Sequence, residues 1–97
     1  MIKLKNNKIK VKCLECKKYH EIEIKHISTE KEQRNISYEY EHIYDGYIKC
    51  DKCGDKIGII LEIYEYPKTF VNSIYPTNKG CTIVSDISFN KNIIDIK

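Results

Sequence analysis

The stretch KCDKCGDK, residues 49–56, decides the fold of this chain, because it places two thiols three positions apart. An upstream stretch, KCLECKK (residues 12–18), repeats that spacing. In each Cys-x-x-Cys turn, here called a knuckle, the two sulfurs point the same way at a distance that one metal ion can bridge. Four thiolates give Zn²⁺ a closed tetrahedral shell with Zn–S distances of about 2.3 Å. We expect one structural zinc ion with two ligands from each knuckle: Cys13, Cys16, Cys50 and Cys53.

The two knuckles differ in the residue that follows them. Gly54 follows the second pair, where such a turn tends to pass through a left-handed backbone conformation, whereas Lys17 follows the first. The stretch between the pairs, residues 17–49, is longer than the roughly 15–20 residues common in such motifs, and a long hairpin would absorb that length. Two other interpretations stay open. One is a redox-sensing thiol protein, since oxidation releases zinc-bound cysteines, and the other is inert thiols.

The four cysteines make the chain resemble the zinc ribbons, in which two knuckles at the ends of β-hairpins share one zinc ion. The resemblance covers roughly residues 11–66 and implies a ribbon fold, not a particular activity. A weaker resemblance links residues 30–84 to small uncharacterised bacterial or phage proteins of the zinc-ribbon type. Two short motifs carry it, Glu65-Tyr66-Pro67 and Gly80-Cys81.

The amino-acid usage favours β-strands. The chain has no alanine and little leucine, which are strong helix formers, but it is rich in isoleucine and has eight tyrosines. At 97 residues it is long enough for one domain and too short for two independent cores, so we expect a single domain over residues 1–97. The predicted fold is all-β, a small antiparallel sheet of about five strands that carries the four-cysteine site.

Alternation of apolar and polar residues places the strands. We expect them at residues 8–12, 19–27, 36–50, 57–66 and 81–87. The pair Asp45-Gly46 resembles a hairpin turn, but a turn there would leave only three residues before Cys50. One long strand, bulged or bent near Gly46, agrees better with the alternation. The remaining segments are expected as a loop, an irregular excursion and a tail that either pairs at an edge or frays: residues 28–35, 67–80 and 90–97.

Few residues suggest catalysis, and we expect no enzyme activity. A zinc ion with four cysteine ligands lacks the open position that a catalytic zinc needs. His20 precedes Glu21 directly, which fails the His-x-Glu spacing of the zinc deaminases, and phosphate loops and HExxH are absent from the sequence. Cys81 with a histidine would make a nucleophile–base pair, but a fifth cysteine is more often a small buried hydrophobe. We interpret His20, His26 and His42 as packing residues, with an alternative ligand to zinc or a second metal site as the other interpretations.

The charge distribution favours a protein partner. Seven lysines against Glu15 give residues 1–18 a charge of +6, which leaves −3 on residues 19–97. An acidic body suits a basic partner surface, and tyrosine is favoured at protein interfaces. We therefore expect a non-catalytic binding protein. A nuclease complex is one candidate partner. The chain would then be a phage-encoded inhibitor of a bacterial immune nuclease (anti-CRISPR type) or a defence-system subunit. The candidate interface residues are Tyr38, Tyr40, Tyr44 and Tyr47.

Nucleic-acid binding is the alternative, because lysines alternate along the N-terminal residues next to the first knuckle. Such lysines can follow phosphates, and the tyrosines could stack on bases. A single arginine, Arg34, counts against base readout, which relies on bidentate arginine. The same alternation of lysine with isoleucine and valine also protects an edge strand from aggregation. The candidate phosphate contacts are Lys3, Lys5, Lys8, Lys10 and Lys12.

The N-terminal segment also bears on the compartment. Residues 1–10 alternate charged and apolar groups, so they do not form the apolar core of a signal peptide. The longest uncharged apolar run, residues 57–61, is far short of the roughly 20 residues that a membrane helix needs. We expect a cytoplasmic protein of a bacterium or of a phage-infected host, without a membrane partner. In that reducing compartment, paired cysteines bind metal more often than they form disulfides.

Overall fold

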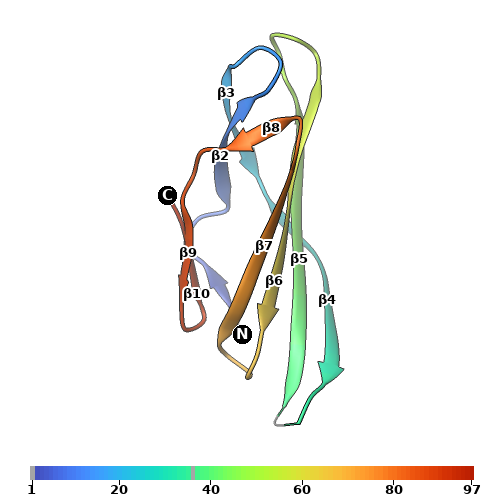
Figure 1. The fold of residues 1–97 in the computed structure, drawn as a ribbon, viewed down its shortest axis with the longest axis vertical. Helices are drawn as coiled ribbons and strands as arrows, with labels where there is room; N and C mark the ends of the chain where they lie inside the picture. The colour runs from blue at the N-terminus through green and yellow to red at the C-terminus, as the bar shows by residue number, and fades with distance from the viewer. Residues whose placement is uncertain (1, 36) are drawn as a thin grey trace.

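In the computed structural model, which describes residues 2–35 and 37–97, the chain consists of strands and connecting turns (Figure 1). The strands are β1 (Lys3–Leu4), β2 (Lys8–Cys13), β3 (Tyr19–Glu23), β4 (Lys25–Gln33), β5 (Tyr38–Lys49), β6 (Lys56–Glu65), β7 (Val71–Lys79), β8 (Cys81–Ile83), β9 (Ile87–Asn90) and β10 (Ile93–Ile96). The all-β prediction is confirmed. The described residues form ten strands in three small sheets rather than about five in one. Within this part of the chain, no helix has the length and apolarity required to cross a membrane.

The largest sheet is antiparallel, with the strand order β4-β5-β6-β7. Side chains of a strand alternate between the two faces of its sheet, and β6 shows this clearly. Its inward-pointing residues are at most 1% exposed, and they are Ile57, Ile59, Leu61 and Ile63. Burial of these apolar side chains is the main favourable contribution to this part of the fold, at about 1.5–3 kcal/mol for each.

Two three-stranded sheets, β3-β2-β8 and β1-β10-β9, cover the inner face of the large sheet. Figure 1 shows both on the same side of it, with β2, β3 and β8 at one end. Their buried residues pack against those of β6 in one core, and they include Ile9, Val11, Ile22, Ile24, Ile94 and Ile96. The molecule measures 49 × 21 × 15 Å, and the far ends of β4 and β5 extend beyond the small sheets.

Three segments form strands where the sequence analysis expected something else or left the outcome open. The loop predicted at residues 28–35 is wrong, because β4 continues to Gln33, and the excursion predicted at 67–80 contains β7. Both are edge strands whose side chains are mostly exposed, so they show no apolar periodicity. The tail pairs as β10 with both β9 and β1. The strand predicted at 19–27 divides into β3 and β4, where the chain passes from one sheet to another.

The long strand predicted through Gly46 is confirmed as β5, but the bend predicted there is wrong. The register with β6 continues without a shift through Gly46, and the pairing with β4 ends at Asp45; the irregularity lies in β4 between His26 and Ser28. Gly46 is required because β3 passes close to it. A Cβ at this position would clash with the carbonyl oxygen of Glu23 and lie 2.7 Å from Cγ2 of Ile22. A glycine within a strand marks either a bulge or a close approach, and here it marks the latter.

Candidate metal centre

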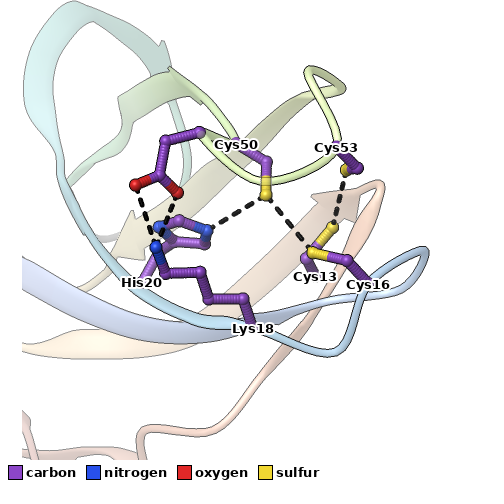
Figure 2. Close-up of polar contacts among 7 residues, drawn as sticks. Cys13, Cys16, Lys18, His20, Cys50 and Cys53 are labelled. Carbon is purple, nitrogen blue, oxygen red and sulfur yellow. Dashed lines mark hydrogen bonds and ion pairs between the residues drawn. The ribbon is translucent and has the colours of Figure 1, made fainter.

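The two knuckles lie together at one end of the molecule, each at the tip of a hairpin. Cys13 ends β2 and Cys16 lies in the turn to β3, whereas Cys50 follows β5 and Cys53 lies in the turn to β6. Figure 2 shows the four side chains converging between the two turns. The hairpins belong to different sheets, so this convergence joins the large sheet to a small one.

The four sulfurs lie close enough together to hold one metal ion. The Sγ atoms of Cys13 and Cys53 are 3.7 Å apart, and those of Cys16 and Cys50 are 3.4 Å apart. All four sulfurs lie within 4.8 Å of one another. A tetrahedron with Zn–S distances of about 2.3 Å has S–S edges of about 3.8 Å. The contacts are much longer than a disulfide bond of about 2.05 Å, and all four cysteines are free thiols, so the group can hold a metal ion.

Both knuckles have the same backbone geometry. In each, the N–H of the first cysteine donates to the carbonyl five residues later, and its own carbonyl accepts from the N–H four residues later, at 2.7–3.0 Å. The residue after the second cysteine is left-handed in both, with φ of 65° at Lys17 and 81° at Gly54. The first knuckle therefore keeps the same turn despite its lysine. A left-handed conformation costs a non-glycine residue about 1–2 kcal/mol.

The second knuckle stabilises one thiolate. The backbone N–H of Cys53 and a contact of 3.3 Å with Nε2 of His20 outweigh desolvation and lower the pKa of Cys50 to about 6. The amide of Asp55 lowers the pKa of Cys53, but desolvation and the neighbouring thiols have the larger combined effect and raise this pKa to about 12. These shifts have different local causes, but four ionised thiolates in contact would in addition repel one another. A cation among the sulfurs removes that repulsion, so the four thiolates favour a bound metal ion.

Two side-chain contacts surround the four sulfurs. His20, on β3, lies against Cys50 and also converges with Asp51, so it is both a supporting group and an alternative ligand. The Nζ atom of Lys18 lies 2.8 and 2.9 Å from the two carboxylate oxygens of Asp51, which joins the knuckles to each other. This ion pair raises the pKa of Lys18 and lowers that of Asp51. Its ends are exposed, so water weakens it.

The fifth thiol is a buried packing residue. Cys81 is 0% exposed, lies opposite Cys13 in the ladder between β2 and β8, and donates to the carbonyl of Gly58 at 3.6 Å. Burial raises the pKa of Cys81. Each histidine that could serve it as a base is hydrogen-bonded to another group. The interpretation of Cys81 as a small buried hydrophobe agrees with this environment.

The N-terminal lysines lie on β1, on β2 and in the link between them: Lys3, Lys5, Lys8, Lys10 and Lys12. The edge-protection interpretation is wrong for β2, which is the central strand of its sheet, between β3 and β8, whereas β1 is an edge strand of its own sheet. Carboxylates lie directly across the ladder from two of these lysines, Glu23 opposite Lys8 and Glu21 opposite Lys10. All of these lysines except the half-buried Lys12 are exposed, and the opposed carboxylates neutralise part of their charge, which weakens the attraction for phosphates. Nucleic-acid binding by these lysines stays a prediction.

The candidate interface tyrosines divide between the two faces of β5. They are Tyr38, Tyr40 and Tyr44 on the face that also carries His42, and Tyr47 on the opposite face. The rings of Tyr38 and Tyr47 are the most exposed, at 42% and 40%. The ring of Tyr47 passes over Gly58, where a Cβ would clash with it. Ile36, which the alternation assigns to the first face, lies outside the described residues.

Carboxylates gather on the outer face of the large sheet, which the sequence analysis missed. This acidic face consists of Glu30, Glu32, Glu39, Glu41 and Glu62. Glu30 lies directly opposite Glu41, and Glu32 directly opposite Glu39. Arg34 pairs with Glu39 at 2.8 Å. The hydroxyl of Tyr64 donates to Glu41 at 2.7 Å, and this bond is the main reason that the pKa of Tyr64 is raised.

Substitutions at the left-handed residues after the two knuckles, Lys17 and Gly54, test the shared turn geometry. We expect Lys17→Gly to raise the free energy of unfolding by up to about 1 kcal/mol, because the left-handed cost exceeds the backbone entropy that glycine adds to the unfolded chain. We expect Gly54→Ala to lower it by about 1 kcal/mol for the converse reason. Urea denaturation of the metal-loaded protein measures both. A loss of stability in Lys17→Gly would contradict the shared turn geometry.

Comparisons with known proteins show no relative. No protein-family model, no curated protein and no solved structure matches this chain. The interpretation of the four cysteines and of the acidic face therefore depends on their geometry and chemistry.

Proposed function

We propose that the chain is a zinc-ribbon-like protein in which the four cysteines bind one structural Zn²⁺. Sulfur contacts of 3.4 and 3.7 Å across the two knuckles support this proposal. Thiolate ligands in tetrahedral geometry favour zinc over magnesium or calcium, which prefer oxygen. Four protein ligands also complete the shell, so the zinc has no position for a substrate.

The ion would contribute most where the apolar core is thin. Structural zinc in finger peptides supplies apparent binding free energies of about 10–16 kcal/mol. The net stability of a domain is about 5–15 kcal/mol, so loss of the ion would remove an amount comparable with the whole. The tips of the β2–β3 and β5–β6 hairpins would then lose the four metal–sulfur bonds that join them.

A single cysteine substitution separates the zinc ligands from the fifth thiol. We expect the wild type and Cys81→Ser to carry one zinc per chain, and Cys16→Ser to lose it, because Cys16 supplies one of four ligand atoms. Cys16 is only partly buried, so serine leaves no large cavity there. Native mass spectrometry measures the stoichiometry, and thermal unfolding with and without chelator measures the stability. Stoichiometric zinc in Cys16→Ser would contradict the ligand set.

We further propose that the acidic face binds a basic protein surface in the cytoplasm. The observation that carries this proposal is the opposed pairing of Glu30 with Glu41 and of Glu32 with Glu39. Like charges directly opposite each other destabilise a sheet, and Arg34 neutralises only part of this charge. A cationic partner would relieve the repulsion and gain association rate from complementary charge. The basic nucleic-acid channel of a nuclease is such a surface. We therefore propose that the chain is a small inhibitor of a bacterial immune nuclease, phage-encoded and of the anti-CRISPR type.

Charge reversal on the acidic face tests this binding mode. We expect the wild type to block DNA binding by a purified guide-loaded bacterial immune nuclease, and Glu30→Lys/Glu32→Lys to do so at least about tenfold more weakly. Both residues are exposed on β4, so the fold tolerates the change. The matched control is Asp55→Lys/Asp86→Lys, which reverses two exposed carboxylates outside the acidic face.

The control should inhibit as well as the wild type. Equal inhibition by all three proteins, or inhibition by none, would contradict the proposal. A gel shift with nucleic acid alone that is lost in Lys8→Glu/Lys10→Glu would favour the lysine strip instead.

A further inference from the structure

Hydrogen bonds connect Thr29, His42 and Glu65 on the inner face of the large sheet. The Oγ1 atom of Thr29 lies 2.9 Å from Nδ1 of His42, and Nε2 of His42 lies 2.8 Å from Oε1 of Glu65. The three residues come from adjacent strands, β4, β5 and β6. The register places Thr29 directly opposite His42, whereas Glu65 lies opposite Tyr40 and therefore diagonal to His42.

Glu65 sets the direction of these hydrogen bonds. Burial raises the pKa of Glu65, but a bond of 2.8 Å from the N–H of Thr69 and the contact with His42 hold the pKa below its usual value. A carboxylate only accepts hydrogen bonds, so Nε2 of His42 donates to it. With Nε2 as the donor, an unprotonated imidazole presents the lone pair of Nδ1 to the hydroxyl of Thr29. Nε2 of His26, 2.6 Å from the same hydroxyl oxygen, can donate to it from the other side.

These groups line a hollow that is open to solvent. Its volume is about 420 Å³, and Tyr40 and Lys68 line it together with the three hydrogen-bonded residues. Thr29 is exposed, whereas the side chains of His42 and Glu65 are 11% and 3% exposed. The ring of Tyr40 lies nearly parallel to that of His42, at 14°, and provides an apolar wall. The hollow therefore combines a reachable hydroxyl, a positioned base and a cationic group.

The backbone at Thr69 is strained, and the strained residue supplies the N–H that fixes Glu65. Its φ of 74° is unusual for a β-branched residue. Strained backbone is concentrated around functional sites, where the surrounding structure maintains it. Here the conformation coincides with the hydrogen bond to Oε2 of Glu65.

We propose that Thr29 is a nucleophile, activated by His42 and oriented through Glu65, that reacts with carboxylic esters of small acids. Thr29 Oγ1 attacks the ester carbonyl carbon while its proton passes to Nδ1 of His42. Lys68 stabilises the oxyanion of the tetrahedral intermediate. The ester C–O bond then breaks, and the departing alkoxide takes the proton from Nδ1. A water molecule, deprotonated by His42, hydrolyses the acyl-threonine to the carboxylic acid and regenerates Thr29.

This activity goes beyond the proposed binding function. The Thr29 site lies on the inner face of the large sheet, opposite the acidic face. The activity also departs from the expectation of no enzyme activity. The nucleophile considered from the sequence was Cys81, not Thr29. The nucleophile is a threonine on an edge strand, and its partners become visible only through the pairing of three strands.

Turnover of p-nitrophenyl acetate by the zinc-loaded full chain, combined with peptide mapping of acetyl groups, tests the proposal. We expect acetylation at Thr29 and a rate at least roughly tenfold above that of Thr29→Val, which keeps the shape but removes the hydroxyl. Thr29→Ser should retain the activity. The matched control is Thr77→Val, at another exposed threonine, on β7, and it should have the wild-type rate. Equal rates in the wild type and Thr29→Val, or acetyl groups on lysines only, would overturn the proposal.

A second variant tests the positioning role of Glu65. Glu65→Gln keeps the shape of the side chain but no longer holds His42 in the required tautomer. We expect it to lower kcat with little change in KM, while its thermal unfolding stays cooperative. An unchanged kcat in the folded variant would overturn the assignment of Glu65, whereas the Thr29 variants decide the nucleophile independently.

Discussion

The convergence of four sulfurs between two hairpin tips is the constraint on which the rest of the structure depends. The tips belong to different sheets, and four thiolates at 3.4–4.8 Å would repel one another without a cation. The backbone N–H of Cys53 lowers the pKa of Cys50 to about 6, whereas the amide of Asp55 is outweighed by desolvation and the neighbouring thiols, which raise the pKa of Cys53 to about 12, so the four sulfurs do not ionise together without a cation. A bound metal ion reverses the sign of the interaction, so that the sulfurs that would separate the sheets instead hold them together.

Coverage of the large sheet then determines what its surfaces can do. The small sheets bury the apolar residues of β6, and the alternation of side chains turns the neighbouring carboxylates to the outer face. The far ends of β4 and β5 extend beyond the small sheets, and the inner face there carries polar and aromatic groups around a hollow. The proposed binding face and the proposed reactive threonine thus lie on opposite sides of one sheet.

The parts of the structure that depend on local patterns could be predicted from the sequence. Cys-x-x-Cys spacing is local, and the alternation along β2, β5 and β6 reflects burial on one side. The edge strands β4 and β7 were missed because exposed strands carry no apolar period. Relations across strands were missed because register is a long-range property: it opposes Glu30 to Glu41 and aligns Thr29 with His42. Gly46 was read as a bend because a strand glycine has two meanings, and only the position of β3 separates them.

X-ray absorption at the zinc K-edge of the purified protein tests the central claim most directly, since it reports the ligand atoms themselves. The account predicts a single shell of four sulfurs at about 2.3 Å, one from each of Cys13, Cys16, Cys50 and Cys53. A shell with fewer sulfurs, or one with an imidazole nitrogen at about 2.0–2.1 Å contributed by His20, would contradict it.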